Sequence, residues 1–333
     1  MNRQPNSPIR DSDGARIAVV GIQGGWSTDQ LLDAVEARTG YRRLIEMQDV
    51  ALQLGDGAST ARVDHHGFDL RELDGVIVKK IARQYSPDAL DRVEILRVLE
   101  RAGVRVFSRP AAMRSLIDRL ACTVELQLGQ IPMPPTTITE SVDEAIAAIT
   151  RYGAAVAKPL YTSKARGMLV LRAETDPASL RAQVESFSRD NPVMYLQQLI
   201  DMPGRDLGVV FLGGEYLATY ARVSGGSWTT STSKGGKYQP HQASDEIIAL
   251  AHRAQALFEL DFTCVDVVET PAGPQVFEVS AFGGFRGLLE ACDIDAAGRY
   301  VDYALSCLER ERPKPTSTSS STTTPTRSAV KHV

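Results

Sequence analysis

The order of apolar runs, turn residues and amphipathic segments predicts a parallel α/β layer followed by α+β units. Up to residue 110, strand-like runs alternate with helical segments, which is typical of a parallel sheet covered by helices. From Ser141 onward the order changes, and a helix, two strands and a helix indicate a compact α+β unit. The chain has 333 residues, of which 43% are hydrophobic, so two or three units with buried cores are expected.

The α/β layer is expected to begin with a strand–turn–helix segment. The apolar run from Arg16 to Gly21 ends in a glycine-rich turn, and Ser27 or Thr28 is placed to cap a helix from Asp29 to Thr39. Gly40 stands where the C-terminal cap of that helix belongs. The further elements expected in this layer are a hairpin of strands 50–54 and 59–63, a strand at 74–79, a helix at 87–102 and a strand at 104–107.

The remaining elements follow from the same patterns. We expect helices at 110–129, 142–152, 177–188, 245–259 and 296–310. We expect strands at 154–158, 168–171, 193–197, 206–212, 215–223, 263–268 and 275–279. Both ends, 1–14 and the Ser/Thr/Pro-rich 312–333, lack an apolar face and are expected to be disordered.

Charge and apolar content argue against several classes of protein. The chain carries 41 acidic and 37 basic side chains, a formal net charge of −4, so a nucleic-acid partner is not expected. No apolar run approaches the roughly 20 residues of a membrane span, and the polar N-terminus does not read as a signal peptide. The four cysteines are expected to be free thiols in a reducing cytoplasm. A homo-oligomer is compatible with the sequence.

Metal binding through cysteine or histidine is not expected. The cysteines show no C-x-x-C spacing and no nearby histidine. His65 and His66 are adjacent, and in an extended segment they would point to opposite faces and could not chelate together.

Two strands near the C-terminus carry a candidate site for a hard cation. A three-residue loop, Pro271 to Gly273, would set a register in which Asp266 faces Glu278. Ser280 shares the face of Glu278 because side chains alternate along a strand. Opposed carboxylates repel unless a cation lies between them, and such ligands suit Mg²⁺ together with nucleotide phosphates. The alternative is a solvated acidic pair, which the apolar neighbours in both strands disfavour.

A lysine at the end of a strand is a candidate phosphate ligand. Lys158 ends the apolar run 154–158, and a loop containing Ser163 and Lys164 reaches Gly167 before the next strand. A point charge beside backbone N–H groups can hold anionic oxygens, although a surface lysine next to a hairpin is the commoner arrangement. The sequence has neither the P-loop spacing nor G-x-G-x-x-G after its first strand.

Three arginines lie near these elements. Arg119 follows Asp118 on a helix, Arg222 ends a strand, and Arg286 follows two glycines and a phenylalanine. Taken singly, each is more readily explained by a structural ion pair. Together with a carboxylate-bound metal, they would suit stabilisation of a transferring phosphoryl group or an acyl phosphate.

These motifs occur in the order found in the ATP-grasp superfamily, which the chain resembles from about Arg16 to Leu308. It is most similar to the RimK/LysX-like branch, the ligases of ribosomal protein S6 and of lysine biosynthesis, and it is also similar to the GAK-system subgroup. The motifs that carry the resemblance are Asp118-Arg119, Lys158-Pro159 with the loop to Gly167, Tyr195 to Ile200, Asp206, Arg222, Val265 to Val267, Phe277 to Ser280 and Gly287 to Asp295.

The resemblance implies an ATP-grasp fold, in which a parallel pre-ATP-grasp lobe precedes two α+β lobes that enclose ATP. The implied boundaries are 15–112 for the first lobe, 113–200 for the next with its helical linker, and 201–311 for the lobe with the metal site. The implied roles are phosphate binding by Arg119, Lys158, Ser163, Lys164 and Gly167, adenine and ribose binding by Gln197, Gln198, Leu199 and Asp206, Mg²⁺ or Mn²⁺ binding by Asp266, Glu278 and Ser280, and acyl-phosphate stabilisation by Arg222 and Arg286.

Three positions depart from the family pattern. Ser280 replaces the usual asparagine ligand, Gly208 stands where the common Asp-Ile-Arg triplet has arginine, and Ala165 stands where the loop often has glycine. The second departure puts the usual binding of a substrate carboxylate in doubt.

The resemblance implies a ligase that uses ATP to activate a carboxylate as an acyl phosphate and joins it to an amine. The carboxylate would belong to a small molecule or a peptide. Two other classes stay open: a small-molecule kinase of the same fold, and a nucleotide-binding regulatory protein without turnover. Lys79, Lys80 and the loop 224–236 are candidates for specificity, with exposed lysines and a mobile loop as the equally good alternative.

Overall fold

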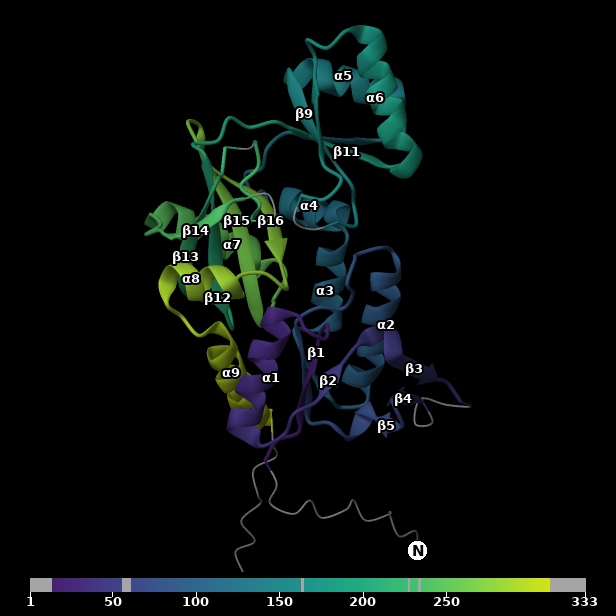
Figure 1. The fold of residues 1–333 in the computed structure, drawn as a ribbon, viewed down its shortest axis with the longest axis vertical. Coiled ribbons are helices and arrows are strands. Elements are labelled where there is room, and N and C mark those ends of the chain that lie inside the picture. Colours follow the sequence, from purple (N-terminus) through teal and green to yellow (C-terminus); the bar gives the residue numbers. More distant parts are fainter. Residues whose placement is uncertain (1–13, 56–60, 163–164, 227, 233–234, 312–333) are drawn as a thin grey trace, which may run out of the picture.

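The computed structural model describes residues 14–55, 61–162, 165–226, 228–232 and 235–311 (Figure 1). The two predicted disordered ends lie outside these ranges, apart from Gly14. The described part is built on four sheets, and helices α3 and α4 connect the lower and upper lobes in Figure 1. None of its helices combines the length and the apolar character that crossing a membrane requires.

The N-terminal layer is a parallel sheet in the order β2-β1-β6-β7, as the alternation of strands and helices predicts. Its strands are β1 Ile17–Val20, β2 Leu44–Ile45, β6 Gly75–Val78 and β7 Arg105–Phe107, and its helices are α1 Trp26–Thr39 and α2 Asp88–Arg101. The expected cap of α1 was wrong. The helix begins earlier, at Trp26, and no side chain caps it, because the cap residue is Gly25; the Thr28 hydroxyl, inside the helix, accepts the backbone N–H of Ile22. Gly40 does adopt the left-handed conformation at its C-terminus.

A small three-stranded sheet extends this lobe. It contains β3 Val50–Gln53, β4 Arg62–His65 and β5 Phe68–Asp69, flanked by 3₁₀ turns η1 Met47–Asp49 and η3 Leu70–Glu72. The predicted hairpin is present, but its second strand starts later than expected. Most of the predicted turn between these strands lies outside the described residues.

The predicted helix 110–129 is broken into α3 Pro110–Ile117 and α4 Arg119–Leu128. Asp118 interrupts it, since its backbone is extended and its carboxylate accepts the N–H of Leu120 as the cap of α4. This break places Arg119 in the first turn of α4, below the upper lobe.

The upper lobe is an antiparallel sheet in the order β10-β9-β11-β8 with two helices. Its elements are β8 Thr136–Thr139, β9 Ala154–Lys158, β10 Leu169–Arg172, β11 Met194–Gln198, α5 Val142–Tyr152 and α6 Pro177–Asp190. Ser141 and Asp176 cap the two helices. β8 was not predicted, because its Thr-rich, half-buried sequence lacks the apolar signal of a core strand.

The third lobe is a five-stranded antiparallel sheet in the order β14-β13-β12-β15-β16. Its elements are β12 Arg205–Leu212, β13 Glu215–Val223, β14 Lys237–Pro240, β15 Phe262–Thr270, β16 Gly273–Ser280, α7 Asp245–Ala256, α8 Phe285–Cys292 and α9 Ala296–Glu311. β14 and α8 were not predicted. α9 packs against α1 of the first lobe, with an ion pair between Arg38 and Asp302, so these two parts of the chain share a core.

The hairpin of β15 and β16 reaches the predicted facing pair by a different route. The turn is one residue tighter than expected, because Thr270 pairs with Gly273. A bulge at Phe277 then adds one residue on β16, and Asp266 faces Glu278 as predicted. The tighter turn shifts the register by one residue and the bulge shifts it back, so the predicted pairing of the two carboxylates is restored.

The glycine that replaces the family's arginine has a packing reason. Gly208 faces Tyr220 across the β12–β13 ladder, and a Cβ at Gly208 would lie 2.4 Å from Cζ of that ring. Gly287 of α8 is equally close, since its Cβ would lie 2.5 Å from the same ring. Tyr220 therefore fills the space that a longer side chain at position 208 would need.

Replacing Gly208 by alanine is expected to destabilise the protein by about 1–3 kcal/mol, because the added methyl overpacks the Tyr220 ring. Urea unfolding measures the loss. In a Tyr220→Leu background the same Gly208→Ala change should cost less, since the shorter side chain makes room for the methyl. Equal stability of Gly208→Ala and the parent would contradict this packing.

Candidate active site

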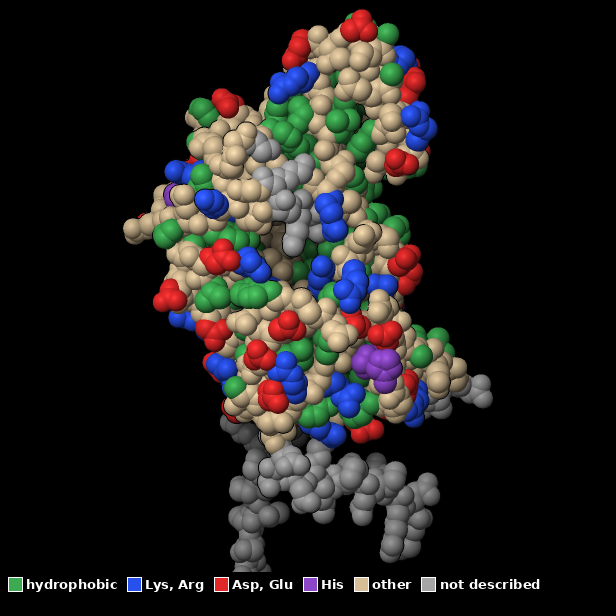
Figure 2. Space-filling model, viewed as in Figure 1, with side chains coloured by type: hydrophobic (Ala, Val, Ile, Leu, Met, Phe, Trp, Pro, Cys, Tyr) green, Lys and Arg blue, Asp and Glu red, His purple; other side chains and the backbone are tan. Residues whose placement is uncertain are grey.

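A cavity of about 440 Å³ lies where the three lobes meet. Figure 2 shows a hollow near the centre of this face, with lysine and arginine side chains around it. The predicted residues that line it are Arg119, Lys158, Gln197, Gln198, Leu199, Asp206, Arg222, Asp266, Glu278 and Ser280. Ser163 and Lys164 lie outside the described residues.

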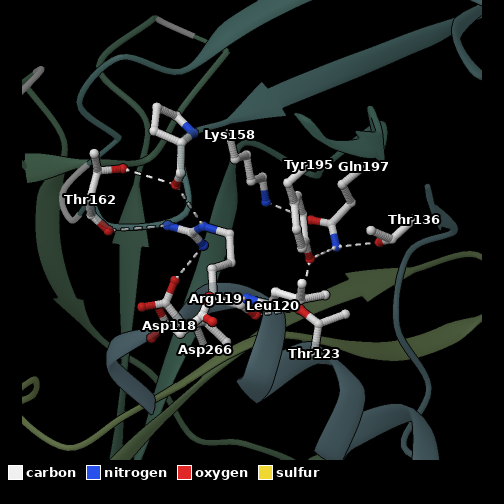
Figure 3. A network of polar contacts seen from close by, with 12 residues as sticks. Asp118, Arg119, Leu120, Thr123, Thr136, Lys158, Thr162, Tyr195, Gln197 and Asp266 are labelled. Carbon is white, nitrogen blue, oxygen red and sulfur yellow. Dashed lines mark hydrogen bonds and ion pairs between the residues drawn. The ribbon is translucent and has the colours of Figure 1, made fainter. Parts of the chain in front are cut away.

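Lys158 enters the cavity from the end of β9. Its Nζ donates to Oε1 of Gln197 at 2.5 Å, and the Gln197 amide is held in turn by Oγ1 of Thr136 at 3.1 Å (Figure 3). Burial, and to a lesser extent the charge of Arg119, lowers the pKa of Lys158 to about 7. The lysine is thus a fixed but only partly charged group that an anion in the cavity would charge fully.

Arg119 joins three elements around the cavity. Its side chain is 8% exposed, and Nη1 donates to Oε2 of Glu278 at 2.9 Å. Nε and Nη2 donate to the carbonyl oxygens of Pro159 and Thr162, at 3.3 and 3.2 Å, in the segment after β9 (Figure 3). The guanidinium therefore ties the phosphate-loop segment to the β16 carboxylate.

Arg222 contacts Asp266, the other carboxylate of the facing pair. It pairs with Asp206 through two contacts, and its Nη2 also lies 2.9 Å from Oδ2 of Asp266. Burial raises the pKa of Asp266 to about 6, Arg222 opposes that rise, and the charges of Asp206 and Glu278 add to it. Three carboxylates thus share two arginines in this part of the cavity.

The donor set fits a hard divalent cation. Asp266 and Glu278 face each other on neighbouring strands, and both line the cavity. The hydroxyl of Ser280 also lines the cavity, and its oxygen accepts the N–H of Phe282 at 3.3 Å. Two carboxylates and a hydroxyl oxygen are ligands that Mg²⁺ accepts together with phosphate oxygens.

Lys79 also lines the cavity. The alternative expectation, that it is an ordinary exposed lysine, was wrong. It is 5% exposed, its Nζ donates to the carbonyl oxygen of Phe282 at 2.7 Å, and it lies 3.6 Å from the centroid of the Phe285 ring. Burial lowers the pKa of Lys79 to about 7. Lys80 lines the cavity beside it.

The lowered pKa of Lys79 predicts a pH-dependent stability. Between about pH 7 and 10.5 the unfolded chain holds a proton at this lysine that the folded chain has lost, so stability rises with pH in that range. Lys79→Met should remove up to about 1.4 kcal/mol per pH unit from the slope. Urea unfolding of both proteins from pH 7 to 10 measures the difference, and parallel pH profiles would contradict the assignment.

Two predicted residues lie outside the lining. Arg286 stacks over Trp26, 4.8 Å from its ring centroid, and its Nη1 is 3.5 Å from Glu290 on the same helix. Arg286 is not among the residues that line the cavity, so the chemistry proposed below does not use it. Gly167 packs near Pro159 with a positive φ of 66°, which shapes the loop after β9.

Aromatic residues in the lining were missed from sequence. Tyr85 stacks on Phe282 with ring centroids 6.4 Å apart, and both rings line the cavity together with Tyr220. Tyr85 lies in a short irregular segment before α2, and Phe282 follows β16 directly. Neither has a spacing or a neighbour that marks it in the sequence.

The chain matches the model of the RimK-like ATP-grasp domain over residues 116–304, more than half of its length. It is 25% identical over 311 residues to the tetrahydromethanopterin:alpha-L-glutamate ligase of Methanosarcina acetivorans, a match that covers 85% of this chain and 96% of that protein.

Two solved structures share the fold. The RimK domain ATP-grasp protein from Sphaerobacter thermophilus has a TM-score of 0.66 and 22% identity, with 87% of this chain and 100% of that chain covered. The ATP-grasp ligase PsnB, in complex with a phosphomimetic variant of its minimal precursor, Mg and ADP, has a TM-score of 0.68 and 19% identity, with 89% and 99% covered. With its three lobes, its central cavity and these matches, the chain belongs to the RimK-like ATP-grasp family.

Proposed function

We propose that the protein is an ATP- and Mg²⁺-dependent ligase that activates a carboxylate as an acyl phosphate and joins it to an amine. The observation that carries this proposal is the pairing of Asp266 with Glu278 inside a cavity that also holds Lys158, Arg119 and Arg222. Curated relatives are named glutamate ligases, which is the same class of reaction.

We assign the cavity residues to metal, phosphate and adenine binding according to their positions. Asp266 and Glu278, with the hydroxyl of Ser280, would hold Mg²⁺, which when bound neutralises phosphate charge. Lys158 and Arg119 would hold the phosphate oxygens of ATP. The segment that starts at Gln198 would bind the adenine, in line with the family resemblance.

Arg222 has a second task in this proposal. Its guanidinium contacts both Asp206 and Asp266. From this position its N–H groups would stabilise the oxygens of an acyl phosphate on the substrate side. An amine attacks the acyl carbon, phosphate leaves, and an amide forms without a protein nucleophile.

The substrates are proposed by class alone. The carboxylate belongs to a small molecule or a peptide, and PsnB is a structural neighbour that was solved with a precursor peptide. Lys80, and Lys79 when it is protonated, add positive charge to the wall formed by the first lobe, which favours a substrate with a further acidic group. All four cysteines of the chain are free, in keeping with a cytoplasmic location.

Incubation of the protein with Mg·ATP, a panel of acids and peptides, and an amine such as glutamate tests the proposal. Release of ADP together with a product that has gained the amine and lost water supports a ligase. A phosphorylated product without an amide would identify the kinase alternative instead. ATP binding without ADP release across the panel would point to a regulatory nucleotide-binding protein.

A further inference from the structure

A second group of metal-type ligands lies outside the cavity lining, at one end of the small sheet β3–β5. One nitrogen of each imidazole of His65 and His66 and one oxygen of Asp49 lie within 4.8 Å of one another. Nε2 of His66 is 4.0 Å from Oδ2 of Asp49, and the two imidazole rings have centroids 4.3 Å apart. Figure 2 shows histidine surface beside this sheet.

The backbone explains how neighbouring histidines come to share one side. His65 is the last residue of β4 and pairs with Phe68, so His66 and Gly67 form a two-residue turn. His66 has a φ of 55°, in the left-handed region, and Gly67 has a φ of 83°. The left-handed residue ends the alternation of side chains, so the expectation that these two side chains point to opposite faces was wrong.

The ladder supplies the third group. Val50 pairs with His65 across β3 and β4, which puts the preceding residue Asp49 next to the turn residue His66. Asp49 ends the 3₁₀ turn before β3. Three ligands from two separate segments therefore converge at one end of the sheet.

One ring nitrogen of the buried histidine lacks a hydrogen-bond partner among the described residues. His65 is 6% exposed, and its Nδ1 is buried with no hydrogen-bond partner among the described residues. A buried polar atom of this kind costs free energy unless something binds it.

We propose that Asp49, His65 and His66 form a zinc site. Two imidazoles and one carboxylate are typical ligands of Zn²⁺, whereas Mg²⁺ prefers oxygen ligands alone, so this site differs in chemistry from the acidic pair of the cavity. Three protein ligands leave a fourth position for water. The bound ion would fix the segment before β3 to the turn between β4 and β5.

The present spacing is slightly wider than a metal requires. Zinc–nitrogen bonds of about 2.0–2.1 Å bring tetrahedral ligands to roughly 3.4 Å from one another. The side chains of His66 and Asp49 are 70% and 35% exposed, so both can turn inward without disturbing the core. His65 is buried, so the other two ligands would move toward it.

The test measures Zn²⁺ binding to the full-length protein with a competing chromophoric chelator, and Co²⁺ binding by its visible absorption. All proteins carry Asp266→Asn, which weakens metal binding in the cavity. We expect one Zn²⁺ per chain and at least tenfold weaker binding in His66→Ala and in Asp49→Asn. Both positions are partly exposed, so circular dichroism should show that the variants stay folded.

Two histidines outside the cluster serve as matched controls. His252→Ala changes an exposed histidine of α7, and His332→Ala changes the one in the C-terminal segment. Both should bind Zn²⁺ as the parent does. Unchanged affinity in His66→Ala and Asp49→Asn, or no Zn²⁺ binding by the parent at micromolar metal, would overturn the proposal, as would loss of binding in a control alone.

Discussion

Replacing Asp266 by asparagine is expected to abolish Mg²⁺-dependent release of ADP. The carboxylate faces Glu278 across β15 and β16, and both line the central cavity. Asparagine keeps the shape of the side chain but removes the charge that holds a hard cation. A metal ion contributes several kcal/mol of charge stabilisation to phosphoryl transfer, and about 4 kcal/mol corresponds to roughly 10³-fold in rate.

The same change leaves the rest of the site in place. Arg222 retains its contacts with Asp206, so its guanidinium is still paired when Asp266 becomes neutral. The loss of activity should therefore come with an unchanged melting temperature within a few degrees. A coupled assay for ADP at saturating Mg·ATP measures the rate, and thermal unfolding checks the fold.

Asp302→Asn is the matched control. It makes the same chemical change in an exposed ion pair with Arg38, outside the cavity, where the contribution to stability is small. Its rate should stay within twofold of the parent. If Asp266→Asn also stayed within threefold, the acidic pair would not be the metal site, and the proposed chemistry would have to move elsewhere.

Much of the fold could be predicted from local patterns, because apolar runs and helix periodicity are properties of short segments. β1, β6, α2 and the strands β12, β13, β15 and β16 all occur close to their expected ranges. The features that were not predicted, one strand and the packing of one predicted helix, depend on contacts distant in sequence. β14 is recognisable only through its pairing with β13, and α9 packs on α1 although 257 residues separate Thr39 from Ala296.

In the candidate site too, features set by local sequence could be predicted and features set by distant contacts could not. The acidic pair could be predicted because a hairpin fixes which residues face each other, even though the tight turn and the bulge at Phe277 were not foreseen. Lys79 was a candidate from the sequence, but its burial and the place of Tyr85 in the cavity could not be predicted, since they depend on how the lobes meet. The histidine turn was misjudged for a local reason, as an extended backbone was assumed at His66.

Replacing Lys158 by methionine is expected to weaken ATP binding by roughly 10–100-fold, the loss of one charge-assisted hydrogen bond to a phosphate oxygen. Methionine fills similar space and removes the donor that now reaches Gln197. Calorimetric titration with Mg·ATP measures the affinity. Lys237→Met, an exposed lysine on β14, should bind as the parent does.

The protonation of Lys158 gives a second and independent readout. Its pKa is about 7 in the free protein, so at pH 8 most of this lysine is neutral, and the phosphates of bound ATP would raise its pKa. Binding at pH 8 should then take up as much as one proton per ATP at this site, while at pH 6 the lysine is already charged and takes up none. ATP affinity should accordingly fall as pH rises above 7.

Titrations at pH 8 in buffers of different ionisation enthalpy measure this uptake. In Lys158→Met the proton uptake should fall by the amount that Lys158 contributes in the parent. The remaining proton uptake would come from Lys79, which lines the same cavity with a pKa of about 7. Identical uptake in the parent and in Lys158→Met would mean that ATP does not contact Lys158. Loss of uptake together with loss of affinity would place the phosphates beside the end of β9, between Gln197 and the acidic pair.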